Sequence, residues 1–525
     1  MVLHGSVARR LGSPRVTHSV WSHRDEPRAH SLRARRLEMQ SAQHEPWVVM
    51  RSDCFVCRSE GLSARSQILL HAGSREIVAS LVHSSGELLG HGEIGLSDMA
   101  WEALGVIEGE EVTVAHAPSA VSLPDLRRRI YGNRLDASAY RGIVNDIVRR
   151  RYTDVHLSAF VTACSTLPMD RDEMVGLTRA MIDAGDRLIW PSRIVVDKHS
   201  VGGLPGNRTT PIVVAIMASE GLVMPKTSSR AITSPAGTAD TMEVLTPVDL
   251  DLATIRRVVE QENGCFVWGG SVRLSPADDI IIGVERVLDV DAVGQLVASV
   301  LSKKLAAGST HLVIDMPVGA TAKVRTSDAA AELSAALEDV GAQFGLKLRV
   351  VTGAGDQPIG RGIGPALEAR DVLAVLQNKN GPEDLVNRAC ELAGALLELA
   401  GRYPKGEGEP AARNAVASGR AWHKFQAICE AQGGLKSVPL ARHRHDIAAQ
   451  ASGTLAAIDN RKLATLAKLA GAPQAKSAGV DVHVRLGDTI QSGLPLCTVH
   501  AESPGELDYA LAFAAAEGAI FKVTP

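Results

Sequence analysis

The chain has 525 residues, of which 45% are hydrophobic and 22% are charged, and its formal net charge is −3. This length exceeds one ordinary domain core, so several domains are expected, and the composition excludes a disordered chain. The near-neutral charge and the 3% of aromatic residues offer no basis for nucleic acid as a partner. No apolar run is long enough to cross a membrane, so no membrane association is expected. The 7 cysteines are an odd number spread along the chain, which favours a reducing, cytoplasmic location over a disulfide framework.

The first 45 residues are rich in arginine and show no hydrophobic period. We interpret 1–45 as a disordered tail, or as residues upstream of a true start at Met39 or Met50. A transit peptide is the less favoured alternative, although an arginine-rich, acid-poor start is compatible with one. This segment is therefore left out of the predicted fold.

From 46 to 120 the pattern changes to short alternating segments, such as Gln67–His71 and Ile77–His83. These segments predict a small β-rich domain. The pair Cys54-x-x-Cys57 lies in it. A structural zinc site needs four ligands and no second such pair exists, so we interpret the two cysteines as part of a strand.

The remaining chain predicts three further parts. In 121–188 the apolar residues of Tyr140–Val148 recur with helical spacing, which indicates a helical domain. In 189–402 strands and helices alternate, which predicts an α/β domain. Proline and glycine then mark 403–433 as a linker with a helix, and 434–525 predicts a C-terminal α+β domain. The predicted fold is therefore multidomain α/β.

The strongest chemical signal is the glycine-rich segment DKHSVGGLPGNRTT at 197–210. It follows a predicted strand and opens a predicted helix, so backbone N–H groups and the helix N-terminus can face an anion. Lys198 adds a point charge, and Ser200 and Thr210 add hydroxyl donors. The segment is neither a Walker loop nor a dinucleotide fingerprint. We interpret it as an anion-binding loop, with a plain tight turn as the alternative.

Three weaker signals follow. The hydroxyl-rich segment 226–240 suits a phosphate or sugar, although alone it is typical of a loop with helix caps. Ser299 and Lys303 lie four residues apart on a predicted helix and so share a face. Asp278 and Asp279 could hold Mg²⁺, but helix capping or a surface loop is the favoured interpretation.

Together these segments resemble the thymidine/AMP phosphorylase family. The resemblance runs from about Leu123 to the C-terminus and depends on motifs in family order, which are DKHSVGG, KTSSRAIT, AGTAD, PADD, SVLSKK and GRGIGPALEARDVL. It implies a helical domain, an α/β domain that closes on it and a C-terminal domain. The implied reaction cleaves the N-glycosidic bond of a nucleoside, or of a nucleoside 5′-monophosphate, with inorganic phosphate as co-substrate.

The resemblance also implies residue roles. Phosphate would be bound by Lys198, Ser200, Thr210, Ser228 and Thr238. The base or sugar would face His199, Ser299 and Lys303. In the AMP-cleaving branch, which also carries an N-terminal β domain, the matching positions that contact the nucleotide are Gly203, Ser229, Arg230, Ala231, Ile232, Thr233, Ser234, Thr238, Ser299 and Lys323. An aspartate matching Asp291 is the proton donor proposed for that branch.

One departure concerns the base. The typical bacterial thymidine phosphorylase places an arginine against the pyrimidine, and the matching position here is Val284. Arg286 is offset by two residues and would point elsewhere on a strand. Pro205 and Asn207 also match the AMP branch. These departures predict that AMP is cleaved better than thymidine, with Arg230 gripping a 5′-phosphate.

Two other functions stay open. A phosphoribosyltransferase of the anthranilate type would use Mg²⁺ on Asp278 and Asp279, but its KHGN-type loop is replaced here by Lys-His-Ser-Val. A nucleotide sensor would bind its ligand at the same site without catalysing a reaction. For the phosphorylase we expect no metal or organic cofactor, small-molecule partners only, and at least a homodimer formed through the helical domain.

Overall fold

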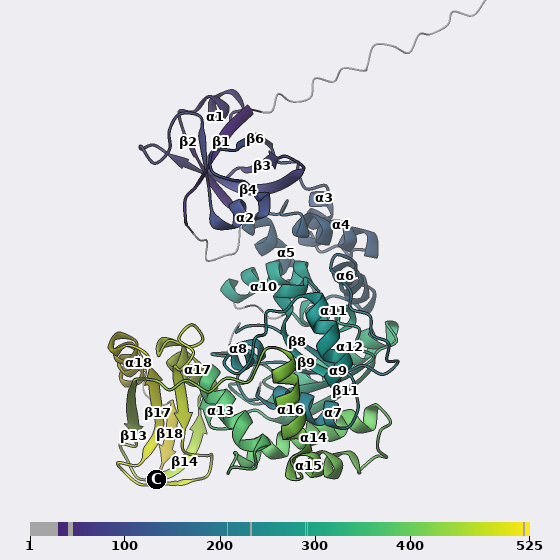
Figure 1. The fold of residues 1–525 in the computed structure, drawn as a ribbon, viewed down its shortest axis with the longest axis vertical. Coiled ribbons are helices and arrows are strands. Elements are labelled where there is room, and N and C mark those ends of the chain that lie inside the picture. The colour runs from purple at the N-terminus through teal and green to yellow at the C-terminus, as the bar shows by residue number, and fades with distance from the viewer. Residues whose placement is uncertain are drawn as a thin grey trace, which may run out of the picture. The chain divides into compact units, whose positions relative to one another are not determined.

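The computed structural model describes residues 30–39, 46–206, 208–231, 234–288, 290, 292–517 and 520–525. These residues belong to two compact units (Figure 1). The first unit runs to Ala120 and includes Arg149–Thr153, and the second contains Val121–Val148 and Asp154–Pro525. No helix in the described ranges is long and apolar enough to cross a membrane.

The first unit is a closed β-barrel with strand order β1-β5-β2-β4-β3-β6. Its strands are β1 (His30–Arg36), β2 (Trp47–Arg51), β3 (Gln67–Ala72), β4 (Arg75–Ser84), β5 (Glu93–Leu96) and β6 (Glu111–His116). Two short helices, α1 (Phe55–Ser59) and α2 (Asp98–Leu104), connect them. Closure leaves no free sheet edge, which is the usual solution for a small β domain. The predicted β-rich domain is present.

Two expectations for this unit are wrong. The predicted tail contains β1, which pairs with both β5 and β6. Only Leu32 and Ala34 of β1 point into the core, between arginines, so the apolar pattern was too short to detect. The pair Cys54 and Cys57 lies at a helix start and not in a strand, because the Cys54 sulfur caps α1 by accepting from the Cys57 N–H at 3.2 Å.

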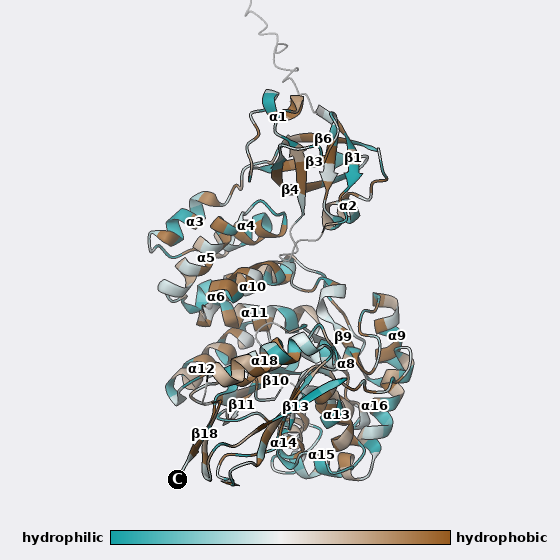
Figure 2. Cartoon of the chain, turned by 90° about the vertical axis from the view of Figure 1, so that its left-hand side faces the viewer, coloured by the Kyte–Doolittle hydropathy of each residue, from teal (hydrophilic) through white to brown (hydrophobic). Residues whose placement is uncertain are grey.

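The second unit begins with a helical layer. It contains α3 (Leu123–Ile130), α4 (Ala137–Val148), α5 (Asp154–Thr166) and α6 (Arg171–Asp183), and α10 (Pro276–Leu288) and α11 (Val293–Ala306) return to pack against them (Figure 2). The predicted stripe is confirmed, since Tyr140, Ile143 and Val144 are buried in this layer.

A parallel sheet forms the centre of this unit. Its strands are β7 (Val196–Ser200), β8 (Met224–Ser228), β9 (Gly264–Trp268), β10 (His311–Val318) and β11 (Lys347–Ala354). The strands β11-β10-β7 form one ladder and β8-β9 another, and the parallel bridge Val195↔Val223 joins them. Helices α7 (Thr209–Ser219), α8 (Thr238–Glu243), α9 (Leu252–Glu262), α12 (Ser327–Gln343), α13 (Pro365–Leu376) and α14 (Glu383–Leu399) connect or follow the strands. The predicted alternation of strands and helices is present.

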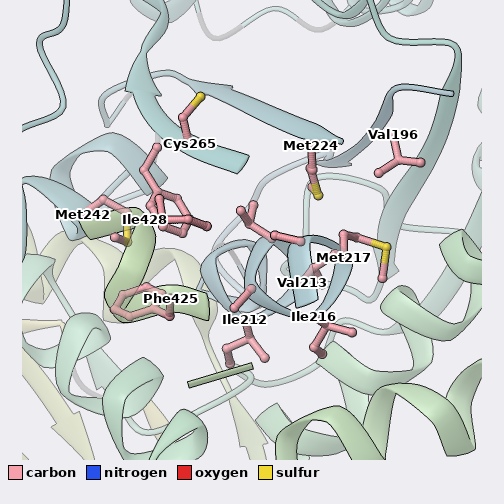
Figure 3. Packing of buried hydrophobic residues seen from close by; sticks show 14 of the residues in the cluster. Val196, Ile212, Val213, Ile216, Met217, Met224, Met242, Cys265, Phe425 and Ile428 are labelled. Atoms are coloured by element: carbon pink, nitrogen blue, oxygen red, sulfur yellow. The ribbon is translucent and has the colours of Figure 1, made fainter. Parts of the chain in front are cut away.

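Helix α7 is buried on all sides, as expected for a helix that is hydrophobic all round. Figure 3 shows its side chains between those of the strands, such as Met224 and Cys265, and those of α16 (Arg420–Ala431), such as Phe425 and Ile428. The expected linker at 403–433 is therefore wrong, because α15 (Gly408–Ala417) and α16 pack into the same core.

The C-terminal part contains two small sheets and two helices. The sheets have the orders β12-β15-β17-β13 and β16-β14-β18. Their strands are β12 (Gly362–Ile363), β13 (His443–Ala448), β14 (Gly453–Ile458), β15 (Gly479–Val482), β16 (Thr489–Ile490), β17 (Pro495–Ala501) and β18 (Phe521–Thr524), with α17 (Asn460–Leu469) and α18 (Pro504–Ala516) beside them (Figure 1). Strand β12 belongs to the glycine-rich loop before α13, so this loop pairs directly with the C-terminal sheet.

Candidate functional site

The polar residues singled out in the sequence meet at the carboxyl ends of the parallel strands. Ser200 is the last residue of β7, and Ser228 is the last residue of β8. The bridge Val195↔Val223 sets these strands in parallel, so both serines lie at the same edge of the sheet. Ligands of open α/β sheets bind at this edge.

Lys198 occupies the centre of this edge. Its ammonium Nζ donates to the hydroxyls of Ser200, Thr209 (2.7 Å) and Thr210 (3.3 Å), and lies 3.4 Å from a carboxylate oxygen of Asp315. The side chain is fully buried. Burial lowers the pKa of Lys198 to about 8, although Asp315 raises it. Ser200 in turn donates to Asp315 and Thr209 to the Gly206 carbonyl. The lysine and the three hydroxyls thus form one hydrogen-bonded cluster, which we call the donor group, at the start of α7, where the helix dipole favours an anion.

The loop between β7 and α7 uses glycine for two reasons. Gly202 and Gly203 have φ values of +96° and +84°, a region that side chains disfavour. A Cβ on Gly203 would also lie 2.6 Å from the backbone nitrogen of Lys323. Only glycine therefore lets the loop approach Lys323 this closely, and the two residues are neighbours in the structure.

Ser228 has an unusual side chain. Its Oγ is buried and has no hydrogen-bond partner in the described part of the chain. A buried hydroxyl of this kind costs free energy unless something binds it. Thr238, the first residue of α8, follows the same loop and is half-buried. Ser228 therefore has hydrogen-bonding capacity left for a ligand.

Beneath the loop lies a buried ionic group. The Asp197 carboxylate lies 2.9 Å from Lys226 Nζ and 2.9 Å from Lys304 Nζ. Lys226 also donates to the Lys198 carbonyl at 2.7 Å. Burial would raise the pKa of Asp197, but the two lysines hold it below its usual value, whereas burial lowers the pKa of Lys304 to about 7. This group holds β7, β8 and α11 in register under the loop.

His199 follows Lys198 on β7 and is half-buried. Burial and the nearby ammonium groups of Lys304, Lys226 and Lys303 lower the pKa of His199 well below its usual value. The imidazole is therefore neutral at pH 7 and can donate or accept a hydrogen bond without carrying charge.

Ser299 and Lys303 lie on α11, as expected. Lys303 Nζ is 2.5 Å from a carboxylate oxygen of Asp278, which belongs to the first turn of α10. Burial lowers the pKa of Lys303, but Asp278 raises it more, so the ammonium stays charged. The favoured interpretation of Asp278 as a surface loop or cap is wrong, because the side chain is buried and bound to Lys303.

Arg230 is not placed as expected. Its guanidinium makes two hydrogen bonds to Glu243, at 2.8 and 2.7 Å, and lies 4.8 Å above the Trp268 ring centroid. Asp240 and Lys476 complete this ionic cluster. Arg230 is therefore already paired with a carboxylate, and its contact with a 5′-phosphate stays a prediction. The guanidinium anchors the loop between β8 and α8 to the end of α8.

The other predicted residues of this loop divide in two groups. The Ala231 N–H donates to Asp240 at 2.6 Å, Ser229 is exposed and Ser234 is buried. Ile232 and Thr233 of this loop lie outside the described residues, and so does Asp291, the proton donor that the resemblance implies.

Sequence reasoning missed Thr209 and Asp315. Thr209 was available as the hydroxyl before Thr210, one residue earlier on the same helix. Asp315 follows the predicted strand Leu312–Ile314, and so lies near the carboxyl edge. It accepts from Ser200 at 3.1 Å and from Arg388 at 2.6 Å.

Comparison with known proteins agrees with this architecture. Residues 125–185 match the family model "Glycosyl transferase family, helical bundle domain" and residues 192–422 match "Glycosyl transferase family, a/b domain". Residues 454–520 match "Pyrimidine nucleoside phosphorylase C-terminal domain". Anthranilate phosphoribosyltransferase from Thermus thermophilus is similar over 58% of this chain and 98% of its own, with 21% identity and a TM-score of 0.48. A similarity of that size says nothing about the reaction.

Full-length relatives are more informative. A protein of Sphingopyxis alaskensis named "Putative thymidine phosphorylase" is 66% identical over 94% of this chain and 96% of its own length. Proteins with the same name in Chelativorans sp. and Tolumonas auensis are 61% and 56% identical, over 95% and 96% of this chain and 98% and 100% of their own lengths. The chain therefore belongs to the thymidine phosphorylase family of glycosyltransferase enzymes.

Proposed function

We propose that the chain cleaves the N-glycosidic bond of a nucleoside with inorganic phosphate, as the relatives' name implies for thymidine. The products are the free base and a pentose 1-phosphate. The observation that carries the proposal is the donor group at the start of α7, where Lys198 meets the hydroxyls of Ser200, Thr209 and Thr210. The unpartnered Oγ of Ser228 supports it from the neighbouring strand.

This geometry suits a nucleophilic phosphate. A phosphate oxygen forms a bond to C1′ while the C1′–N bond breaks, through an oxocarbenium-like transition state. The site must hold the anion in line with C1′, which is positioning work. Lys198 and Ser228, with Thr238 and the Gly202–Gly203 backbone, would hold it.

The electron pair of the breaking bond passes to the base, where negative charge builds up. Lys303 is charged and lies on the helix that also carries Ser299. It would stabilise this charge electrostatically. His199 is neutral and would contribute a hydrogen bond. Asp291 remains the proton donor that the family resemblance implies.

The decisive assay measures base release from a panel of AMP, CMP, UMP and thymidine, each with and without phosphate. We expect release only with phosphate, together with a phosphorylated pentose. Equal release in phosphate-free buffer would show hydrolysis and contradict the proposal.

The same panel decides between two substrate classes. Val284 is half-buried on α10 and offers no hydrogen bond to a pyrimidine. The expectation that Arg286 lies on a strand is wrong, but two residues on a helix are about 200° apart, so Arg286 still faces another direction. Val284 therefore favours a nucleoside 5′-monophosphate, AMP before thymidine. Since Arg230 is bound to Glu243, this candidate depends on Val284 and on Pro205 and Asn207, which match the AMP branch. A higher kcat/KM for thymidine would exclude it.

The phosphoribosyltransferase alternative would need Asp278 as a ligand for Mg²⁺, and this carboxylate is already paired. Asp278 is bound to Lys303, so a cation there would have to displace an ammonium group. We propose that no metal or organic cofactor takes part, and that activity survives exhaustive treatment with EDTA. Loss of activity with EDTA and recovery with Mg²⁺ would favour the phosphoribosyltransferase alternative.

The seven cysteines are free and buried, which supports a cytoplasmic location.

A further inference from the structure

Behind the start of α7 lies a buried ionic network that the proposed reaction does not use. Arg208 precedes α7 and its side chain is fully buried. One guanidinium nitrogen donates to the Gly362 carbonyl in β12, and another lies 3.4 Å from a carboxylate oxygen of Glu368 on α13. A charged arginine is thus enclosed directly beneath the candidate phosphate loop.

Glu368 also contacts a second element of the site. The Thr241 hydroxyl on α8 lies 3.3 Å from its other carboxylate oxygen and shares its proton between that oxygen and the Gly237 carbonyl at 3.1 Å. Thr241 lies one turn after Thr238 on the same helix, so the two share a face of α8. One buried carboxylate therefore contacts both Arg208, which precedes α7, and Thr241 on α8. These two helices carry the predicted phosphate ligands Thr210 and Thr238.

We infer that Glu368 is a positioning residue for phosphate, which holds the first turns of α7 and α8 at one spacing through Arg208 and Thr241. The inference depends on the proposed phosphate site. Thr210 and Thr238 come from these two helices, so a change in their spacing would separate donors that must reach the same anion. Small errors of this kind weaken binding of an ion held by several directed groups.

The surrounding charges make the network sensitive to pH. Burial raises the pKa of Glu368 to about 7, Arg208 lowers it and Asp371 raises it. The other nearby carboxylates already have partners: Asp240 on α8 accepts from the Gly237 N–H, and Asp481 on β15 pairs with Arg370. Above pH 7 Glu368 is ionised and binds Arg208 most strongly.

The test compares Glu368→Gln, on α13, with a control at the far end of α7. Glu220 caps the opposite end of α7, is buried, and accepts from Arg420 and Tyr403, both at 2.7 Å. Glu220→Gln therefore removes an equivalent buried carboxylate without touching the phosphate loop. We expect Glu368→Gln to raise the KM for phosphate about tenfold at pH 8, the scale of losing one charged hydrogen bond. The kcat at saturating phosphate changes much less, and Glu220→Gln leaves both constants near wild type.

The pH dependence separates positioning from general damage. Because glutamine imitates the neutral acid, the ratio of the variant's KM to that of the wild type should fall toward one at pH 6. The ionisation of phosphate itself cancels in this ratio. A ratio of one at pH 8, or an equal rise in the KM of Glu220→Gln, would overturn the inference.

Two additions keep the test decisive. If Glu368→Gln does not fold, Thr241→Val removes the hydroxyl at nearly constant volume and should raise the same KM. An unchanged KM in that variant overturns the inference. Lys198→Ala is measured beside them. If Lys198→Ala loses phosphate binding and Glu368→Gln has a normal KM for phosphate, the positioning role of Glu368 is wrong and the phosphate site stands. If Lys198→Ala itself has a normal KM for phosphate, the proposed phosphate site is wrong.

Discussion

Lys303 and Lys304 are consecutive on α11 but bind carboxylates of different elements. Lys303 Nζ lies 2.5 Å from Asp278 on α10, and Lys304 Nζ lies 2.9 Å from Asp197 on β7. Consecutive helix residues point about 100° apart, so one helix serves two partners. Helix α11, which carries Lys303, is therefore tied through Lys304 to β7, the strand that carries Lys198. The residue expected to face the base and the residue expected to bind phosphate are thus held by connected elements.

Lys198→Ala is expected to reduce kcat/KM by about 10²-fold or more, because it removes a preorganised electrostatic stabiliser. Steady-state kinetics with varied phosphate checks this. Lys424→Ala is the control, since Lys424 makes only a partly exposed pair with Glu262 at 2.8 Å. Normal phosphate affinity in Lys198→Ala would show that the loop has been assigned wrongly.

Asp278→Asn tests the charge on Lys303. Without the carboxylate, burial dominates and the pKa of Lys303 falls, so the ammonium loses its proton at lower pH. We expect the alkaline limb of the kcat–pH profile to move to lower pH and kcat to fall about 10²-fold. Asp279→Asn is the matched control, because Asp279 is exposed and contributes less to this pKa. Identical profiles for the two variants would contradict the assignment.

Glu368→Gln also predicts a stability change with a definite sign. The pKa of Glu368 is raised to about 7 in the folded chain, from 4.5. Its contribution to stability is therefore full below pH 4.5 and is lost as pH rises to about 7. Glutamine does not titrate, so the Tm of the variant minus that of the wild type should increase from pH 5 to pH 8. Thermal unfolding across this range checks it, and a constant difference would contradict the raised pKa.

Self-association is expected to involve the helical layer. Tyr131 and Val155 expose 82% and 77% of their surface there, so both side chains are accessible to a second copy of the chain. We expect at least a dimer by light scattering, and Val155→Asp should shift the mass toward one chain. Tyr509→Asp on α18, 73% exposed, should not. A wild-type mass near the 55.5 kDa of one chain would refute the dimer.

Local patterns predicted much of the fold and part of the site. The alternation of strands and helices, the buried helix α7 and the apolar stripe of α4 each depend on residues close together in the sequence. The short strand β1 was missed, because its two inward residues make too weak a pattern among arginines. In 403–433 a helix was expected and is present, but the expected linker is wrong, because proline and glycine before α15 are typical of a linker.

The sequence by itself determined the donor group of Lys198, since its lysine, glycines and hydroxyls lie in one segment between a strand and a helix. Only the tertiary structure decided where the long charged side chains point. Arg230 binds Glu243, Lys303 binds Asp278, and Glu368 lies against Arg208. The physical reason is burial: a charge removed from water must find an opposite charge or a hydrogen bond. When that partner lies far along the chain, only the fold determines which one it is.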